Sequence, residues 1–162
     1  CPNRIVNSIL GVKGSLYRQK NIAFSFDCRL PEPLSLSGVT LCSLFTNVLD
    51  NAYHAVQSGV PELRRIDLSA YLVNGFLLLT CQNPIPPGSQ PKLGRRRKSE
   101  DGTQHGLGLL ILQTIAEQHK GTMEIQTAND IFQIRLLLQL PAPSTSPVPA
   151  SILPQKEEAT PV

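Results

Sequence analysis

The sequence predicts an α+β fold, a two-layer α/β sandwich in which helices cover one face of a mixed, mostly antiparallel sheet. Three segments carry apolar residues at helical spacing: 3–20, 37–58 and 107–119. Five others have the length and composition of strands: 22–28, 66–73, 76–82, 122–127 and 131–140. Because helices interleave with strand pairs along the chain, we expect the helices to pack together on one face of the sheet.

The first helix and the first strand show different periodicities. Between residues 3 and 20, apolar residues recur at helical spacing: Ile5, Ile9, Val12 and Leu16, beside Val6, Leu10 and Tyr17. Between 22 and 28, apolar and polar residues alternate, which is typical of a half-buried strand with these residues on one face: Ile22, Phe24, Phe26 and Cys28. Pro31 and Pro33 close this region.

Local signals mark the ends of the other two helices. Ser37 is predicted to cap the second helix, and Gly59-Val60-Pro61 to end it. The apolar stripe of this helix is Leu41, Leu44, Phe45, Val48, Leu49, Ala52, Ala55 and Val56. Lys120-Gly121 is the C-terminal signal of the third helix.

The remaining strands form two predicted pairs with a long loop between them. Asn74-Gly75 joins the strands 66–73 and 76–82, and this dipeptide is the strongest short hairpin signal. Ala128-Asn129-Asp130 separates the last two strands. Residues 84–105 carry prolines, glycines and charges without periodicity, and a loop of this length is usually functional or disordered.

Composition favours one folded domain with a tail. Of the 162 residues, 41% are hydrophobic and 17% charged, which is unlike a disordered protein. No apolar run approaches the roughly 18 residues that span a bilayer. The net charge of +3 and the few aromatic residues argue against nucleic-acid binding. Residues 141–162 are rich in Pro, Ser and Thr, and we expect them to form a disordered tail.

The four cysteines, Cys1, Cys28, Cys42 and Cys81, contain no CxxC pair and no histidine at ligand spacing. This argues against a zinc site. The last three lie in apolar segments, where free cysteine behaves as a small hydrophobe, and this suits a reducing cytoplasm.

The second helix carries a polar stripe. Asn47 and Asn51 are four residues apart and His54 is three further on, so all three share one helix face. Two carboxamide oxygens on one face can hold a hard cation such as Mg²⁺. The alternative on this segment alone is a solvated helix face.

Two further motifs precede the third helix. Residues 102–109 contain three glycines and lead into that helix, and glycine-rich backbone at a helix N-terminus favours an anion such as phosphate. The alternative is a flexible linker before a capped helix. Asn83 follows an apolar strand and offers a side-chain acceptor at the mouth of the sheet, although such an Asn often only ends a strand.

Taken in order, these motifs resemble the gyrase, chaperone, histidine-kinase and mismatch-repair ATPase superfamily over roughly residues 3–140. Residues 47–55 look like its N box, Asn83 stands where its first glycine box begins, and Gly102 to Gly108 look like its second glycine box. Residues 84–105 match its ATP lid. The resemblance implies the Bergerat-type ATP-binding fold, with ATP and Mg²⁺ as cofactors.

Within the superfamily, hydrolytic members typically place a Glu four residues before the second Asn, where it activates water. Asn47 occupies that position here, and sensor kinases carry Asn there. The resemblance therefore implies the catalytic domain of a bacterial two-component histidine kinase. Residues 3–27, 44–55 and 105–109, and Asn83 in place of Asp, are most similar to quorum-sensing kinases of the accessory-gene-regulator type.

The resemblance also implies roles for individual residues. Asn47 and His54 are the expected catalytic residues, and Asn51 and Asn47 the expected Mg²⁺ ligands through ATP. The expected nucleotide-binding residues are Asn51, Asn83, Lys98, His105, Gly106, Leu107, Gly108 and Leu109.

The expected division of the chain follows the same family. Residues 1–20 are a helix continuing from an upstream dimerisation region, 21–140 the ATP-binding domain, and 141–162 the tail. No phosphoacceptor is expected within the chain, because His54 and His105 lie in nucleotide motifs and His119 at a helix end. The expected partners are upstream dimerisation and phosphoacceptor helices and a response regulator, in a full-length homodimer. The location is the cytoplasmic side of a membrane-anchored sensor.

Some residues depart from the family pattern and leave alternatives open. Asn83 is followed by Pro84-Ile85-Pro86-Pro87 in place of spaced glycines, and His54 stands where classical kinases often place Lys. The basic run at residues 95–98 either directs charge to phosphate or is a solvated loop. The two alternative functions are a nucleotide-free partner-docking module and a serine protein kinase like the anti-sigma-factor kinases.

Overall fold

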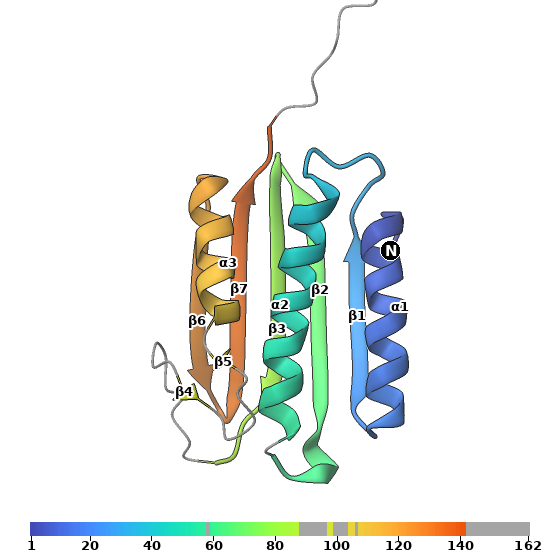
Figure 1. Ribbon diagram of the computed structural model, residues 1–162, viewed down its shortest axis with the longest axis vertical. Coiled ribbons are helices and arrows are strands. Elements are labelled where there is room, and N and C mark those ends of the chain that lie inside the picture. The colour runs from blue at the N-terminus through green and yellow to red at the C-terminus, as the bar shows by residue number, and fades with distance from the viewer. Residues whose placement is uncertain (58, 88–96, 99–103, 106, 142–162) are drawn as a thin grey trace, which may run out of the picture.

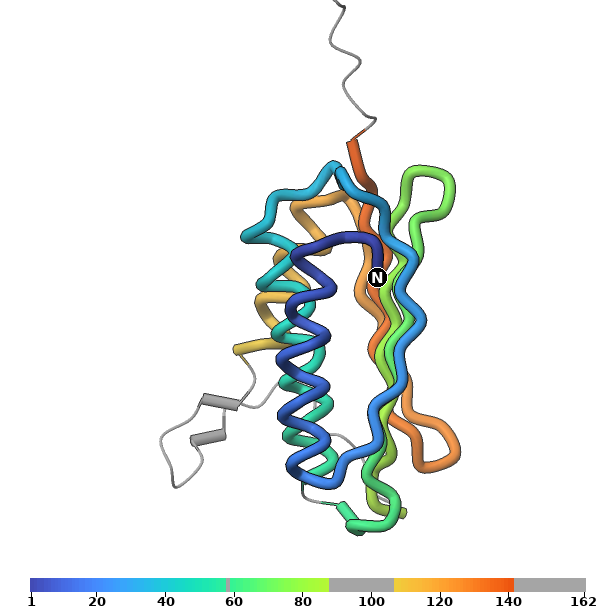
Figure 2. Tube along the Cα trace, turned by 90° about the vertical axis from the view of Figure 1, so that its right-hand side faces the viewer, coloured from blue at the N-terminus to red at the C-terminus, as the bar shows by residue number. Residues whose placement is uncertain are grey.

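The computed structural model describes residues 1–57, 59–87, 97–98, 104–105 and 107–141. Within these residues, a five-stranded sheet forms one layer and the helices pack on one of its faces (Figures 1 and 2). The helices are α1 (Arg4–Gln19), α2 (Gly38–Gln57) and α3 (Leu107–Gln118), with a short 3₁₀ turn η1 (Pro61–Leu63). The strands of the sheet are β1 (Ala23–Arg29), β2 (Arg65–Val73), β3 (Phe76–Pro84), β6 (Thr122–Ala128) and β7 (Ile131–Gln139).

The strand order is β1-β2-β3-β7-β6. β1 and β2 are parallel, and the other neighbours are antiparallel, so the predicted mixed sheet with helices on one face is confirmed. Both predicted hairpins form, and their turn residues take the positive φ that such turns need: 51° at Asn74, 81° at Gly75, 51° at Asn129 and 57° at Asp130.

The core lies between the sheet and the helices, and α2 is its central element. Seven α2 residues are buried: Leu41, Leu44, Phe45, Val48, Leu49, Ala52 and Val56. Each fully buried leucine of this kind contributes about 1.5–3 kcal/mol relative to an exposed one. Ser37 Oγ accepts from Thr40 N at 3.0 Å, as its predicted role as helix cap requires. In the described part of the chain, no helix is both long enough and apolar enough to cross a bilayer.

Three details of the core differ from the sequence prediction. Val12 is 71% exposed, because the buried stripe of α1 runs through Val6, Leu10 and Tyr17. Phe26 is 47% exposed, on a strand at the edge of the sheet. Cys42 is exposed, because it follows the buried Leu41 by one position and so points away from the core.

The ends of β3 and of α3 also differ from the sequence prediction. β3 continues through Asn83 to Pro84, which pairs with Ile131, so Asn83 lies inside the strand and does not follow its end. At the end of α3, Lys120 and not Gly121 takes a positive φ, of 47°. Gly121 is needed for another reason, since a Cβ there would lie 1.9 Å from the Leu137 carbonyl oxygen.

Candidate functional site

The topology brings the predicted site segments to one end of the molecule. α2 and β3 run toward the end at which α3 begins (Figure 1). Ile85 N donates to the Asp130 carbonyl oxygen at 2.9 Å, so the end of β3 lies beside the β6–β7 turn at that same end. The two-residue strands β4 (Arg97–Lys98) and β5 (Gln104–His105) pair nearby (Figure 1).

Asn47 lies where α2 meets the first turn of α3. Its Nδ2 donates to the Ser43 carbonyl oxygen at 2.7 Å and to Ser43 Oγ at 3.3 Å. A Cβ added to Gly108 would lie 3.1 Å from Asn47 Oδ1. The carboxamide is therefore held by its nitrogen, and its oxygen is presented to the backbone at the start of α3. The small residue at 108 permits this close approach.

Asn51 lies one turn further along α2 and is half-buried. Among the described residues, its side chain makes no hydrogen bond. Its amide oxygen is thus available as a ligand on the same helix face as Asn47. His54, at the end of this stripe, is exposed, and its ring centroid lies 5.6 Å from that of Tyr53.

Contacts from α1 fix this part of α2 from the other side. Lys13 forms an ion pair with Asp50, the residue before Asn51. The Tyr17 hydroxyl donates to the Leu49 carbonyl oxygen at 3.0 Å, and the Tyr17 ring stacks on Tyr53 with centroids 5.6 Å apart. Burial raises the pKa of the Tyr17 hydroxyl, and the nearby Asp50 charge raises it further, so this group remains a donor.

Asn83 is one of two polar residues among the buried described residues, with 2% of its surface exposed. Burial alternates along β3, so Asn83 shares the helix-covered face with Leu79 and Cys81. Its Nδ2 donates to the Pro84 carbonyl oxygen at 3.0 Å. Oδ1 is therefore the side-chain atom left to accept a hydrogen bond from a bound molecule.

The start of α3 has the electrostatics of an anion site. Its first turn contains no acidic residue, so the positive end of the helix dipole is not offset there. Leu107 is 49% exposed, whereas Leu109 is partly buried against the core.

Lys98 and His105 belong to the β4–β5 pair, in which Lys98 lies opposite Gln104. Gly106, most of the predicted lid and residues 142–162 lie outside the described residues.

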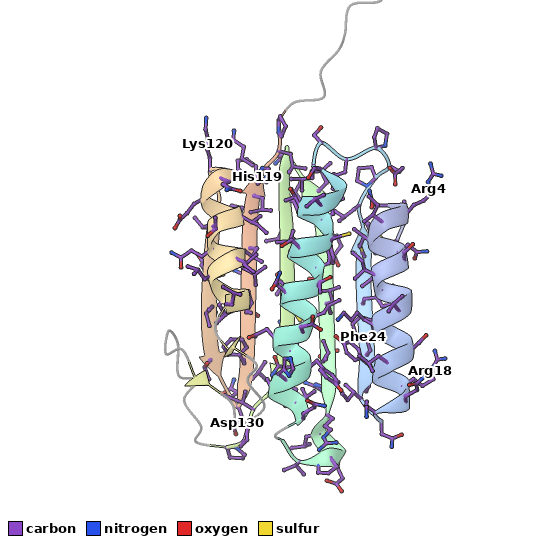
Figure 3. All side chains as sticks on the ribbon, viewed as in Figure 1. Arg4, Arg18, Phe24, His119, Lys120 and Asp130 are labelled. Carbon is purple, nitrogen blue, oxygen red and sulfur yellow. The ribbon has the colours of Figure 1, made fainter. Side chains whose placement is uncertain are left out.

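The sequence motifs predicted Asn47, Asn51 and Asn83 as site residues but did not indicate the residues that contact them or their neighbours on α2. Ser43, Lys13 and Asp50 gave no motif signal, although Lys13 lies four residues before Tyr17 and so on the same side of α1. His119 and Lys120 lie at the end of the molecule opposite to Asp130 (Figure 3). His119 is therefore remote from the end where the site residues gather.

Comparison with known proteins shows which family the chain resembles. The family model of the GHKL domain matches residues 36–139. The sensor histidine kinase HprS of Escherichia coli K12 is 28% identical over 142 residues, which make up 83% of this chain and 30% of HprS. The nitrogen regulation protein NtrY of Azorhizobium caulinodans is 29% identical over 136 residues, 78% of this chain and 18% of NtrY. The chain thus spans less than a third of either relative.

Solved structures show the same fold. The nucleotide-free catalytic domain of histidine kinase ThkA matches with a TM-score of 0.65 at 17% identity, covering 85% of this chain and 91% of that one. Histidine kinase AdeS of Acinetobacter baumannii matches with a TM-score of 0.61 at 15% identity, covering 84% of this chain and 63% of that one. The predicted sandwich is the fold of histidine kinase catalytic domains, and the chain belongs to the GHKL domain family, with sensor histidine kinases among its relatives.

Proposed function

We propose that this domain binds ATP with Mg²⁺ and donates the γ-phosphoryl group to a histidine outside residues 1–162, as part of a two-component sensor kinase. The observation that carries the proposal is the approach of Asn47 to the first turn of α3, with Asn51 and Asn83 on α2 and β3, which run toward the same end of a GHKL domain. Phosphoryl transfer needs mainly positioning and charge neutralisation, and this arrangement offers both.

The donor set fits a hard cation. Asn47 and Asn51 carry carboxamide oxygens one helical turn apart, and oxygen is the ligand that Mg²⁺ takes while keeping several waters. Mg²⁺, when bound with ATP, neutralises charge on the phosphate oxygens. The Ser43 contacts hold Asn47 by its nitrogen and so keep its oxygen toward the start of α3. The N-terminus of α3 adds backbone N–H groups suited to phosphate.

Asn83 is the proposed adenine-reading residue. Its free oxygen accepts a hydrogen bond from an exocyclic amino group, but a neutral acceptor binds less strongly than the carboxylate that the family usually has. The loss is about 0.5–1.5 kcal/mol, equivalent to up to about tenfold in dissociation constant. We therefore expect weak nucleotide binding. Lys98, His105, Gly106, Leu107 and Leu109 complete the proposed nucleotide-binding set.

The phosphoryl group is proposed to go to histidine because the site lacks a water-activating carboxylate at position 47. Asn47 cannot remove a proton from water, so hydrolysis should be slow. His54 is the second proposed catalytic residue, beside Asn47. The proposed partners are an upstream region and a response regulator, and the proposed location is the cytoplasmic side of a membrane sensor; the likeness to sensor histidine kinases supports both. The likeness to accessory-gene-regulator-type kinases stays a prediction.

Calorimetric titration of the chain with a non-hydrolysable ATP analogue, with and without Mg²⁺, tests the proposal. We expect saturable, Mg²⁺-dependent binding that Asn51→Ala abolishes without changing the circular dichroism spectrum. Asn7→Ala, at an exposed position on α1, is the matched control and should bind as the wild type does. Preserved binding by Asn51→Ala would contradict the metal-ligand role.

One observation favours a second candidate, a nucleotide-free docking module. Pro84 continues β3, and Ile85 is hydrogen-bonded to the β6–β7 turn. The backbone directly after Asn83 is therefore held by the sheet and the turn, unlike the backbone of a flexible glycine loop. This segment also lines a cavity with Val56, Val60 and Leu63. If the wild-type chain binds no nucleotide at several millimolar, this candidate replaces the kinase proposal.

A further inference from the structure

Two cysteine side chains meet at the end of the molecule remote from the proposed nucleotide site. Cys1 Sγ and Cys28 Sγ lie 2.6 Å apart, about half an ångström longer than a disulfide bond of about 2.05 Å. Cys1 precedes α1, and Cys28 lies near the end of β1. The chain start bends back from α1 toward the sheet, and the N-terminus lies beside the strands (Figure 2).

Hydrogen bonds of backbone and side-chain groups hold the two thiols in this position. Asn3 N donates to the Leu30 carbonyl oxygen at 3.0 Å, and Asn3 Nδ2 donates to the Pro31 carbonyl oxygen at 3.3 Å. Arg4 N donates to Glu32 Oε2 at 2.9 Å. These bonds join the residues after Cys1 to the residues after Cys28, so the sulfur contact belongs to an ordered junction between α1 and β1.

We propose that Cys1 and Cys28 form a reversible dithiol–disulfide site, with a low-molecular-weight disulfide such as oxidised glutathione as the oxidant. The Cys1 thiolate attacks one sulfur of the oxidant, breaks its S–S bond and releases one thiol. The Cys28 thiolate then attacks the Cys1 sulfur of the mixed disulfide and releases the second thiol. The protein loses two protons and two electrons in total, and the oxidant is reduced to two thiols.

The environments of the two thiols assign this order. Cys1 is half-exposed and therefore accessible to a small oxidant, whereas Cys28 is 7% exposed. Burial raises the pKa of the Cys28 thiol, which makes it the poorer first nucleophile, and its sulfur, 2.6 Å from that of Cys1, is positioned to resolve a mixed disulfide formed there. Among the described cysteines, Cys42 is exposed and Cys81 buried, and neither contacts another sulfur. Cys42 and Cys81 are therefore internal controls: the first shows how an exposed thiol reacts, and the second how a buried thiol reacts, when no second thiol lies beside it.

The disulfide would covalently close the chain around α1 and β1. It lies at the N-terminal end of α1, whereas the proposed nucleotide site lies at the other end of the molecule (Figure 1). Oxidation should therefore leave nucleotide affinity unchanged. The inference does not depend on the proposed function, because it concerns thiol chemistry that is measured without nucleotide.

The test equilibrates the reduced 162-residue chain with mixtures of reduced and oxidised glutathione, blocks remaining thiols by alkylation at low pH, and maps the products by mass spectrometry. We expect a Cys1–Cys28 disulfide, recognised by the loss of two hydrogens, to persist at glutathione ratios that reduce any mixed disulfide at Cys42. Cys28→Ser should instead accumulate glutathione on Cys1, and Cys42→Ser should oxidise as the wild type does.

Two results would overturn the proposal. One is glutathione adducts at Cys42 and Cys1 in equal yield with no intramolecular product. The other is a Cys28→Ser variant in which Cys1 is no more modified than Cys81. Serine replaces cysteine at nearly constant volume, and far-ultraviolet circular dichroism of each variant shows that it has folded. A thermal melt of the wild-type chain in both redox states adds a second measurement, since the cross-link should raise the melting temperature.

Discussion

Tyr17→Phe tests whether α1 holds α2 through one buried hydroxyl. The Tyr17 side chain has no exposed surface, its hydroxyl bonds the Leu49 carbonyl oxygen at 3.0 Å, and its ring packs edge-on against Phe24. Phenylalanine keeps the ring contacts and removes only the hydrogen bond. At pH 7 we therefore expect a loss of about 0.5–1.5 kcal/mol in the free energy of unfolding.

The difference in the free energy of unfolding between the wild type and Tyr17→Phe should disappear or reverse at high pH. Burial raises the pKa of folded Tyr17 above the ordinary value of 10.0, so above pH 10 the unfolded chain loses a proton that the folded chain keeps. The contribution of this group is present below pH 10 and is lost as the pH rises. At pH 11 the wild type should have lost about 1.4 kcal/mol through Tyr17, while Tyr17→Phe loses nothing by this route.

Guanidinium unfolding of both proteins at pH 7 and pH 11 measures the difference directly. The variant should be less stable at pH 7 and equal to the wild type, or more stable, at pH 11. Tyr71→Phe is the comparison: the hydrogen bond from the half-buried Tyr71 to Asp27 also raises the pKa of that hydroxyl, but solvent screens this surface interaction, so the change with pH should be smaller. A difference between wild type and Tyr17→Phe that stays constant from pH 7 to pH 11 would refute the proposed burial of the hydroxyl.

Three further substitutions test the site and the fold. Gly108→Ala places a Cβ 3.1 Å from Asn47 Oδ1, so the ATP titration should show weaker binding, while helix propensity offsets the strain by about 1 kcal/mol in thermal unfolding. Gly121→Ala meets the Leu137 backbone and should destabilise the fold by about 1–3 kcal/mol in guanidinium unfolding, with nucleotide affinity per folded molecule unchanged. Asn83→Asp restores a charged acceptor and should tighten analogue binding up to about tenfold at a cost in stability of the unliganded protein; unchanged or weaker binding contradicts the adenine role.

The secondary structure was predictable because its signals are local. Ser37 caps α2 through a contact three residues away, and Asn74-Gly75 takes the positive φ angles that its composition favours. The apolar stripe of α2 follows helical spacing because one face of the helix lies on the sheet. Neighbouring residues alone determine these features, so the sequence contains what is needed to find them.

Other features depend on residues far apart in the chain. Pro84 belongs to β3 because Ile131 pairs with it, and Val12 is exposed because the contacts of α1 run through Leu10 and Tyr17. The motifs identified Asn47 and Asn51 but carried no trace of the Lys13–Asp50 ion pair, whose partners are 37 positions apart. Long-range supports of a site have no fixed spacing, so periodicity and motifs do not reveal them.

The segment of α2 from 47 to 54 is constrained from three sides at once. Its apolar face lies in the core, its polar face meets α3 at Gly108, and its flank is bonded to α1 through Leu49 and Asp50. The carbonyl and carboxylate that α1 contacts therefore belong to residues directly before Asn51. Any displacement of α1 along its axis moves Lys13 and Tyr17 together, and the backbone that carries Asn51 cannot keep both contacts unless it follows. The geometry of the polar stripe thus depends on α1 as well as on α2.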